Sequence, residues 1–391
     1  MKFHSRRTAI IVLHAAIAVA GVVTVILGPL LPFLIARWSL SDERAGLLFL
    51  FQFGGNLAGI LSLGALLSRR GYSTVFLLGF ICIALGVAGL DARTAIVGCI
   101  ATFLFGYGLG LVLAATNLCV AEMEKSRRAS ALSLLNLAWG IGAISCPLLI
   151  FLAQRARRLS ALPLVIAALA LVAGLTFAAL SAELPKEELT VTSPQEHADT
   201  VSLRTAMILG SLFLVYVGTE NSVSGWAAAL AKRVAPQAAS AWELAPMCFW
   251  GGLLAGRSAA PAAFRRVGER ALMVTGLGFS AMCIVALAFV TSLHIAELCL
   301  CGAGLGFAYI YPLLIAWMVE NYGDQARRAG NVPFALASIG GATLPWLVGF
   351  VSTKTASLRA AMAVPAAGCL VMIGLLSLLR SPEISRDSRI P

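Results

Sequence analysis

Long stretches without a charged residue dominate this sequence and constrain its fold more than any other feature. Two of them run from Ala95 to Ala121 and from Leu159 to Leu180. A helix needs about 20 such residues to cross the hydrocarbon core of a membrane. A soluble domain is roughly 25% charged because its surface must be polar, whereas this chain of 391 residues is 12% charged and 59% apolar. The composition therefore excludes a soluble enzyme, a disordered protein and a disulfide scaffold, and predicts a polytopic membrane protein.

The number and length of the apolar stretches predict an all-α fold with twelve transmembrane helices. A β-barrel is excluded because its strands alternate apolar and polar residues over segments of about ten, whereas the apolar runs here are unbroken. We expect the spans near residues 8–36, 44–67, 73–91, 94–122, 130–153, 159–180, 204–231, 240–263, 270–291, 293–320, 327–353 and 358–380.

The positive charges predict which side of the membrane holds the chain ends. Of the 29 Lys and Arg residues, 19 fall on the side of the N-terminus and 10 on the other side. Because Lys and Arg are enriched in cytoplasmic loops, both termini are predicted to lie in the cytoplasm, with the protein in a bacterial inner membrane. The net charge of +11 comes from these loops, so nucleic acid is not expected as a partner. Three arginines close together on the outer side are an exception to this bias: Arg155, Arg157 and Arg158. They are interpreted as tolerated loop charges, with contacts to lipid headgroups or to an anionic substrate as the alternative.

The chain divides into two halves of similar length. The polar segment 181–203 lacks helical periodicity, and we expect a cytoplasmic linker there, between one six-helix bundle at 1–180 and another at 204–391. Short glycine-containing patterns recur in both halves in the same order, at an offset near 190–200 residues. Parallel repeats of this kind are typical of secondary transporters. The matching pairs are Gly64–Arg69 with Gly252–Arg257, Gly106–Gly110 with Gly302–Gly306, and Trp139–Ala143 with Ile339–Ala342.

The segment between the second and third spans resembles a known motif. Gly64-Ala-Leu-Leu-Ser68-Arg69-Arg70-Gly71 is similar to the Gly-x-x-x-Asp-Arg-x-Gly loop of the major facilitator superfamily, with serine in place of the usual aspartate. The resemblance implies the two-bundle fold of that family and a place in a gating or structural loop for Gly64, Arg69 and Gly71, and for Arg257 in the second half. The glycines let helix ends approach closely, and an arginine can bind the carbonyls of a helix C-terminus.

Four further stretches resemble one branch of this superfamily, the fucose/galactose/glucose:proton symporters. The resemblance implies transport of a monosaccharide together with protons. Members of the fucose type carry one carboxylate in the first span and another in the fourth. Here the first span has none and the fourth has only Glu122 at its cytoplasmic end, so their coupling scheme does not transfer. The four stretches are Tyr216–Trp226, Phe249–Arg257, Tyr309–Pro312 and Pro345–Gly349.

Glu220 is the one carboxylate deep within a predicted span. An ionisable group at that depth costs about 2.5–3.5 kcal/mol on insertion scales, which makes it a functional candidate. Tyr216, Glu220 and Ser224 are four residues apart and share one helix face. We therefore expect Glu220 to face a central cavity, where it contacts substrate hydroxyls or carries the coupling proton. The alternative is a hydrogen-bond anchor between helices that never meets substrate.

Other polar and aromatic residues inside the spans are candidates for a substrate site. Amides offer both donors and acceptors to sugar hydroxyls, and aromatic rings stack on the apolar faces of sugars. Each candidate has a structural alternative as a helix–helix contact or as packing, and that alternative is favoured for His14, Asn117 and Asn136. The predicted substrate-binding residues are Gln52, Asn56, Asn136, Trp139, Glu220, Asn221, Trp250, Tyr309 and Tyr311.

Motifs of energy-driven or catalytic proteins are missing from the sequence. It contains no Walker motif, nucleophile elbow or metal-binding cluster, and its nine cysteines lie in apolar runs. We therefore expect neither an enzyme nor a cofactor or metal. The prediction is a monomeric secondary transporter in the lipid bilayer that moves a small polar solute, a monosaccharide, with protons or sodium. A drug, lipid or metabolite exporter of the same fold is the second hypothesis, and a receptor or sensor is the third.

Overall fold

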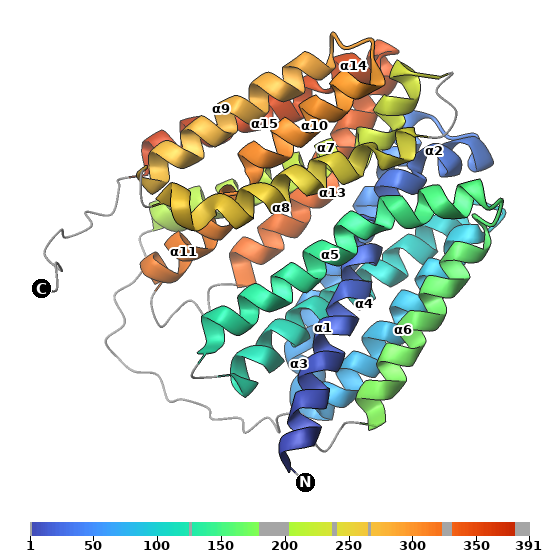
Figure 1. The fold of residues 1–391 in the computed structure, drawn as a ribbon, viewed down its shortest axis with the longest axis vertical. Coiled ribbons are helices and arrows are strands. Elements are labelled where there is room, and N and C mark those ends of the chain that lie inside the picture. Colours follow the sequence, from blue (N-terminus) through green and yellow to red (C-terminus); the bar gives the residue numbers. More distant parts are fainter. Residues whose placement is uncertain are drawn as a thin grey trace, which may run out of the picture.

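The computed structural model describes residues 2–124, 127–179, 203–236, 241–264, 267–322 and 331–379. The predicted linker at 181–203 lies outside these residues, except for Leu203, the first residue of a helix. Every regular element that the structure describes is helical (Figure 1). The main helices are α1 (Lys2–Val25), α2 (Leu27–Trp38), α3 (Asp42–Ala88), α4 (Ala95–Met123), α5 (Arg128–Arg155), α6 (Ala161–Ala179), α7 (Leu203–Val234), α8 (Ala245–Phe264), α9 (Glu269–Leu287), α10 (Leu293–Phe307), α11 (Ile310–Tyr322), α13 (Asn331–Thr355), α14 (Leu358–Ala361) and α15 (Ala363–Leu378), with short 3-10 helices η1 (Gly89–Asp91) and η4 (Trp242–Leu244).

The described helices account for the predicted number of membrane crossings. Nine helical segments are long and apolar enough to span a membrane, counting α10 with α11 as one segment and α14 with α15 as another. The pair α1 and α2, bent by 43°, makes a tenth crossing. The bend falls at Ile26, shortly before Pro29, which lacks the N–H that would continue the helical hydrogen bonds. α8 has 20 residues and adds one crossing. α3 adds the last, because it crosses twice.

α3 crosses twice because the chain reverses direction at Gly71. Gly71 has φ 70° and ψ 173°, a conformation that residues with a side chain rarely adopt. Gly55, on the first arm, packs on the carbonyl of Phe103 in α4, and Gly86, on the second arm, packs on that of Ala101 in the same helix. The two arms therefore lie beside α4 at the same depth. The predicted all-α fold with twelve spans is confirmed.

The helices form two bundles (Figure 1). α1 to α6 pack mainly on one another and are called the N-terminal bundle, and α7 to α15 form the C-terminal bundle. Among the described residues, most contacts between the bundles come from α3 with α13, α2 with α7, and α5 with α8, and η4 and α8 add smaller contacts with α2 or α5. The starts of α1 and α7 lie on what we call the terminal side. The ends of α2, α7 and α13 lie on the opposite side.

The two bundles repeat the same helix contacts, which confirms their pseudo-symmetry. A side chain added at Gly55 would meet the carbonyl of Phe103 in α4, and one added at Gly252 would meet that of Cys301 in α10. These close contacts let α3 approach α4, and α8 approach α10, at the corresponding place. The register of the repeat differs from the prediction, since Gly252 corresponds in space to Gly55 and not to Gly64.

This register changes the interpretation of Arg257. The sequence pattern paired it with Arg69, and Arg69 lies exposed near the end of the first arm of α3, as expected for a residue beside the bend at Gly71. Arg257 instead lies inside α8, which continues to Phe264. The expectation of a loop position for Arg257 is therefore wrong. It came from aligning Gly252 with Gly64, whereas the helix contacts align Gly252 with Gly55, which lies well inside a helix.

Candidate functional site

A small cavity lies between the two bundles, about midway along the helices. The break between α1 and α2 and the first arm of α3 form one wall, and α7 and α8 form the other. Three of the nine predicted substrate-binding residues line it: Gln52, Asn221 and Trp250. The complete lining is Thr24, Val25, Leu27, Gly28, Phe49, Gln52, Asn221, Ser224, Gly225 and Trp250.

The polar side chains in this lining are held in place by backbone carbonyls. Gln52 is buried, and its Nε2 donates to the carbonyl of Thr24 at 2.8 Å. Asn221 donates through Nδ2 to the carbonyl of Val217 at 2.8 Å, and the Ser224 hydroxyl donates to that of Glu220 at 2.9 Å. Each amide keeps its oxygen and a second N–H, so the cavity offers both acceptors and donors from fixed positions.

Two tryptophans form the aromatic part of the site. Trp250 is 4% exposed, and its ring meets that of Trp139 edge to face, with centroids 5.5 Å apart. Trp139 donates from Nε1 to the Thr24 hydroxyl at 3.4 Å. The Nε1 of Trp250 is buried and has no hydrogen-bond partner among the described residues. A buried donor of this kind costs free energy until a partner reaches it.

Glu220 belongs to a second group of buried side chains, one helical turn nearer the terminal side than Ser224. It is 8% exposed, and its carboxyl group interacts with the Arg257 guanidinium and the Tyr216 hydroxyl. Tyr216 is fully buried, stacks on Tyr311 with ring centroids 5.8 Å apart, and donates to the Phe307 carbonyl at 3.5 Å. The structure thus brings Glu220 and Tyr311 together in the C-terminal bundle, beside the lining of the cavity and not in it.

Arg257 was predicted from the sequence as a gating or structural residue, but its place in this group was not predicted. It is half-buried inside α8, and its Nε has no hydrogen-bond partner within the part of the chain that the structure describes. Its position well before the predicted end of the eighth span, at 263, was a signal that could have identified it. Because Arg257 is a half-buried cation near Glu220, the net charge of this group is zero when the Glu220 carboxyl is ionised and +1 when it holds a proton.

The other predicted site residues do not line the cavity. Asn56 accepts a hydrogen bond from the Ser338 hydroxyl at 3.1 Å, across the contact of α3 with α13. Asn136 is exposed and donates to the carbonyl of Leu132 at 3.0 Å in its own helix. Tyr309 is half-buried at the break between α10 and α11. Asn56 thus joins the bundles, whereas Asn136 bonds within its own helix.

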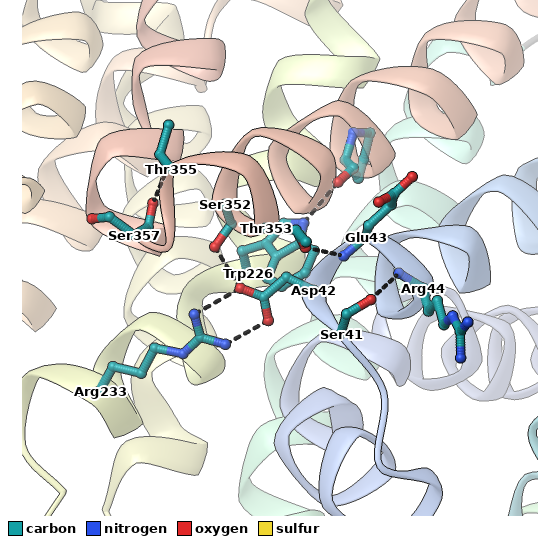
Figure 2. A network of polar contacts seen from close by, with 11 residues as sticks. Ser41, Asp42, Glu43, Arg44, Trp226, Arg233, Ser352, Thr353, Thr355 and Ser357 are labelled. Carbon is teal, nitrogen blue, oxygen red and sulfur yellow. Dashed lines mark hydrogen bonds and ion pairs between the residues drawn. The ribbon is translucent and has the colours of Figure 1, made fainter.

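An ion pair between the bundles closes the opposite side (Figure 2). Asp42 begins α3, and its carboxylate accepts two hydrogen bonds from Arg233 near the end of α7, at 2.7 and 2.5 Å. The hydroxyl of Ser352 in α13 donates to the same carboxylate. Beside them, the backbone N–H of Glu43 donates to the hydroxyl of Thr353 at 2.9 Å. One carboxylate therefore connects the N-terminal bundle to two helices of the C-terminal bundle.

A second contact closes the same side between α2, α5 and η4. The ring of Trp242 packs against Phe33 of α2, with centroids 5.1 Å apart. The Nζ of Lys232 lies 5.0 Å from the centroid of the Trp242 ring. Neither closing contact was predicted, because Asp42, Arg233 and Lys232 stand at span ends, where charged residues are ordinary. In the part of the chain that the structure describes, no three His, Cys, Asp or Glu residues form a group that could hold a metal ion.

Known sequences are similar to this chain over most of its length. The sequence pattern of the Major Facilitator Superfamily matches residues 13–332. A glucose/galactose transporter of Brucella abortus biovar 1 (strain 9-941) is 25% identical over 351 residues, which are 84% of this chain and 84% of that protein. The glucose/mannose transporter GlcP of Bacillus subtilis (strain 168) is 27% identical over 140 residues, 35% of this chain and 34% of that protein.

Solved structures share its fold. A bacterial homologue of the human lysosomal transporter Spinster, in an inward-facing and occupied conformation, superposes with a TM-score of 0.77 at 14% identity, over 95% of this chain and 96% of that chain. A mutant of the nucleoside transporter NupG superposes with a TM-score of 0.76 at 12% identity, over 95% of this chain and 100% of that chain. At such identities the likeness concerns the fold alone.

Proposed function

Because this chain belongs to the Major Facilitator Superfamily, and is therefore a membrane transporter and not an enzyme, we propose that its solute is a hexose. The hexose binds between the bundles at this cavity and crosses by alternating access. The cavity has a volume of about 10 Å³ in this closed arrangement, enough for about one water molecule, so the bundles must separate there to admit the solute. The names of the glucose/galactose and glucose/mannose transporters support a sugar as the solute.

The observation that carries this proposal is the chemistry of the cavity lining. Gln52 and Asn221 offer amide groups from opposite bundles, and the Trp250 indole N–H lacks a partner among the described residues. A sugar hydroxyl is both a donor and an acceptor, so it satisfies an amide oxygen and an indole N–H at once. The Trp250 and Phe49 rings supply the apolar surface on which a sugar face stacks.

The position of the cavity supports alternating access. Its walls belong to different bundles, so a rocking motion that separates the bundles on one side exposes the bound solute to that side. Residues 1–180 and 204–391 act as the two moving bodies, with 181–203 as the linker. In this proposal the protein lies in a bacterial inner membrane with both termini on the cytoplasmic side. The opposite side of the structure then faces outward. The chain works as a monomer.

Glu220 carries the coupling proton in this proposal. It is buried beside Arg257, one helical turn from Ser224 in the cavity lining, so a change in its charge acts directly on the solute site. Uptake driven by a sodium gradient, and not by a proton gradient, would contradict this part of the proposal.

Direct binding to the purified protein tests the solute class. We expect saturable binding of one or more hexoses from a panel of hexoses and pentoses. Asn221→Ala should weaken that binding by about 1 kcal/mol, or roughly fivefold, because a hydrogen bond to the solute is lost.

Asn117→Ala is the matched control for this experiment. The Nδ2 of Asn117 donates to the carbonyl four residues earlier at 2.8 Å, as that of Asn221 does, but Asn117 does not line the cavity. The two variants therefore lose the same local bond and differ in access to the solute. No binding of any sugar, with tight binding of lipids or hydrophobic cations, would favour the exporter hypothesis instead.

A further inference from the structure

Glu243 is a carboxylate that the mechanism above does not use, and it lies where the bundles close on the opposite side. It is the middle residue of η4, which packs against α7 and α8 of its own bundle and against α5 and α2 of the N-terminal bundle. Glu243 is 1% exposed. Its neighbour Trp242 packs on Phe33 of α2. The buried Glu243 therefore lies in an element that contacts both bundles.

The immediate surroundings of Glu243 do not satisfy a charged carboxylate completely. Its Oε2 atom is buried and has no hydrogen-bond partner among the residues that the structure describes. Burial raises the pKa of the Glu243 carboxyl, while a backbone hydrogen bond and the positive charges of Lys232 and Arg155 oppose the rise. Removal from water disfavours the charged form, so the closed arrangement favours a carboxyl group that holds a proton.

The ionisable groups around Glu243 come from two of the four elements that pack on η4. α7 supplies Lys232 and α5 supplies Arg155. In α2 the charged residue is Arg37, which is paired with Asp91 at 2.6 Å. The first turn of α8, Ala245 to Cys248, contains no charged residue. Two cations thus oppose the rise that burial causes in the pKa of Glu243. One of them, Arg155, is exposed to solvent, which screens its charge.

We propose that Glu243 binds a proton as the bundles close on the opposite side and releases it as they separate there. The proton comes from hydronium in the solution on that side, which leaves water and converts the carboxylate to a neutral carboxyl group. On separation, η4 leaves α2 and α5, Glu243 meets water, and the proton returns to the same solution. The inference rests on the bundle motion proposed above but not on the role of Glu220.

The direction of the pH effect follows from linkage. A carboxyl group with a higher pKa in the closed state than in the open state stabilises the closed state when it is protonated. The ratio of open to closed molecules therefore rises as the pH rises through the pKa of the exposed carboxyl toward that of the buried one. A single proton can change this ratio by at most about tenfold per pH unit.

Trp242 is a reporter for this equilibrium, because closure holds it at 8% exposure. Quenching of its fluorescence by acrylamide is measured on the purified full-length protein between pH 5 and pH 8, as the difference from a Trp242→Phe variant. We expect quenching to increase with pH in the native protein. In Glu243→Gln, which cannot ionise, we expect quenching to stay at the low-pH value throughout.

Two more variants separate titration from packing. Arg155→Gln removes a cation that opposes protonation of Glu243, so the increase in quenching should move to higher pH. Asp91→Asn removes a carboxylate that bonds within the N-terminal bundle, so it should leave the native pH profile unchanged. The same pH dependence in Glu243→Gln as in the native protein would overturn the role of Glu243. Quenching insensitive to pH and solute in every variant would instead contradict the bundle motion itself.

Discussion

Replacing Asp42 by asparagine should weaken the contact that holds the bundles together on the opposite side. The native carboxylate receives two hydrogen bonds from Arg233, at 2.7 and 2.5 Å, and one from Ser352. Asparagine has nearly the same shape but has no charge and one acceptor oxygen. The variant therefore loses the ion pair and at least one hydrogen bond without leaving a void.

The expected magnitude follows from the exposure of the two partners. Breaking a fully buried ion pair costs about 3–5 kcal/mol, and breaking an exposed one costs about 0.2–1 kcal/mol. The Asp42 side chain is 11% exposed and that of Arg233 is 41% exposed, so solvent screens the pair in part. We therefore expect a loss of about 1–2 kcal/mol in the closed state. Such a loss increases the open-to-closed ratio roughly 5- to 30-fold.

Hydrogen exchange at the Glu43 backbone amide measures this ratio. The Glu43 N–H lies in the first turn of α3, where it has no partner within the helix, and it donates across the interface to Thr353. Separation of the bundles breaks that bond and exposes the amide to water. When closing is faster than exchange, the exchange rate is proportional to the open fraction. We expect the Glu43 amide to exchange about 5- to 30-fold faster in Asp42→Asn.

Two further variants decide whether the ion pair is the cause. Arg233→Gln should accelerate exchange at Glu43, and adding it to Asp42→Asn should have little further effect, because the two residues act as one unit. Asp91→Asn breaks the pair with Arg37 inside the N-terminal bundle and should leave Glu43 exchange unchanged. Native exchange at Glu43 in a folded Asp42→Asn protein, or fully additive effects of the two single variants, would refute the reasoning.

The remaining predictions concern coupling, the solute site and the helix contacts. Glu220→Gln should retain solute binding but lose uphill accumulation in proteoliposomes, and unchanged proton-driven uptake would remove Glu220 from the mechanism. Trp250→Phe removes an indole N–H that is unpaired among the described residues, so the thermal unfolding temperature should stay nearly native while solute affinity falls by about 1 kcal/mol in a binding titration. Gly142→Ala places a methyl group against the carbonyl of Ala18 and should destabilise the protein by about 1–3 kcal/mol, which a lower unfolding temperature would show. Gly64→Ala, with no atom within 4 Å of the added methyl group, is its control and should unfold at or slightly above the native temperature.

The sequence predicted the fold well because the lipid environment leaves few alternatives. In the hydrocarbon core every backbone N–H and C=O must be bonded within the protein, so a long apolar run can only be a helix. The run from Ala95 to Ala121 accordingly lies within α4. Sequence reasoning also placed Gly71 in the motif between the second and third spans, and the structure puts the bend at this residue, with a φ of 70° that favours a residue without a side chain.

The candidate site was only partly predictable from the sequence. Gln52, Asn221 and Trp250 were identified because polar and aromatic side chains inside a span are conspicuous. Arg257 was assigned to a loop, because glycine patterns in a helix recur at several registers and contacts are needed to choose among them. Thr24 was missed, because a hydroxyl can always bond within its own helix and carries little signal.

By itself the sequence determined that this chain is a membrane protein of twelve helices in two related halves, and that Glu220 is an unusual carboxylate within a span. The length and charge of each apolar run decide these properties one segment at a time. Only the tertiary structure decided which residues meet between the bundles. Asp42 pairs with Arg233, and Glu243 becomes buried against α5 and α2, because two rigid bundles dock in one orientation. No local pattern records that docking, since its partners lie far apart in the chain.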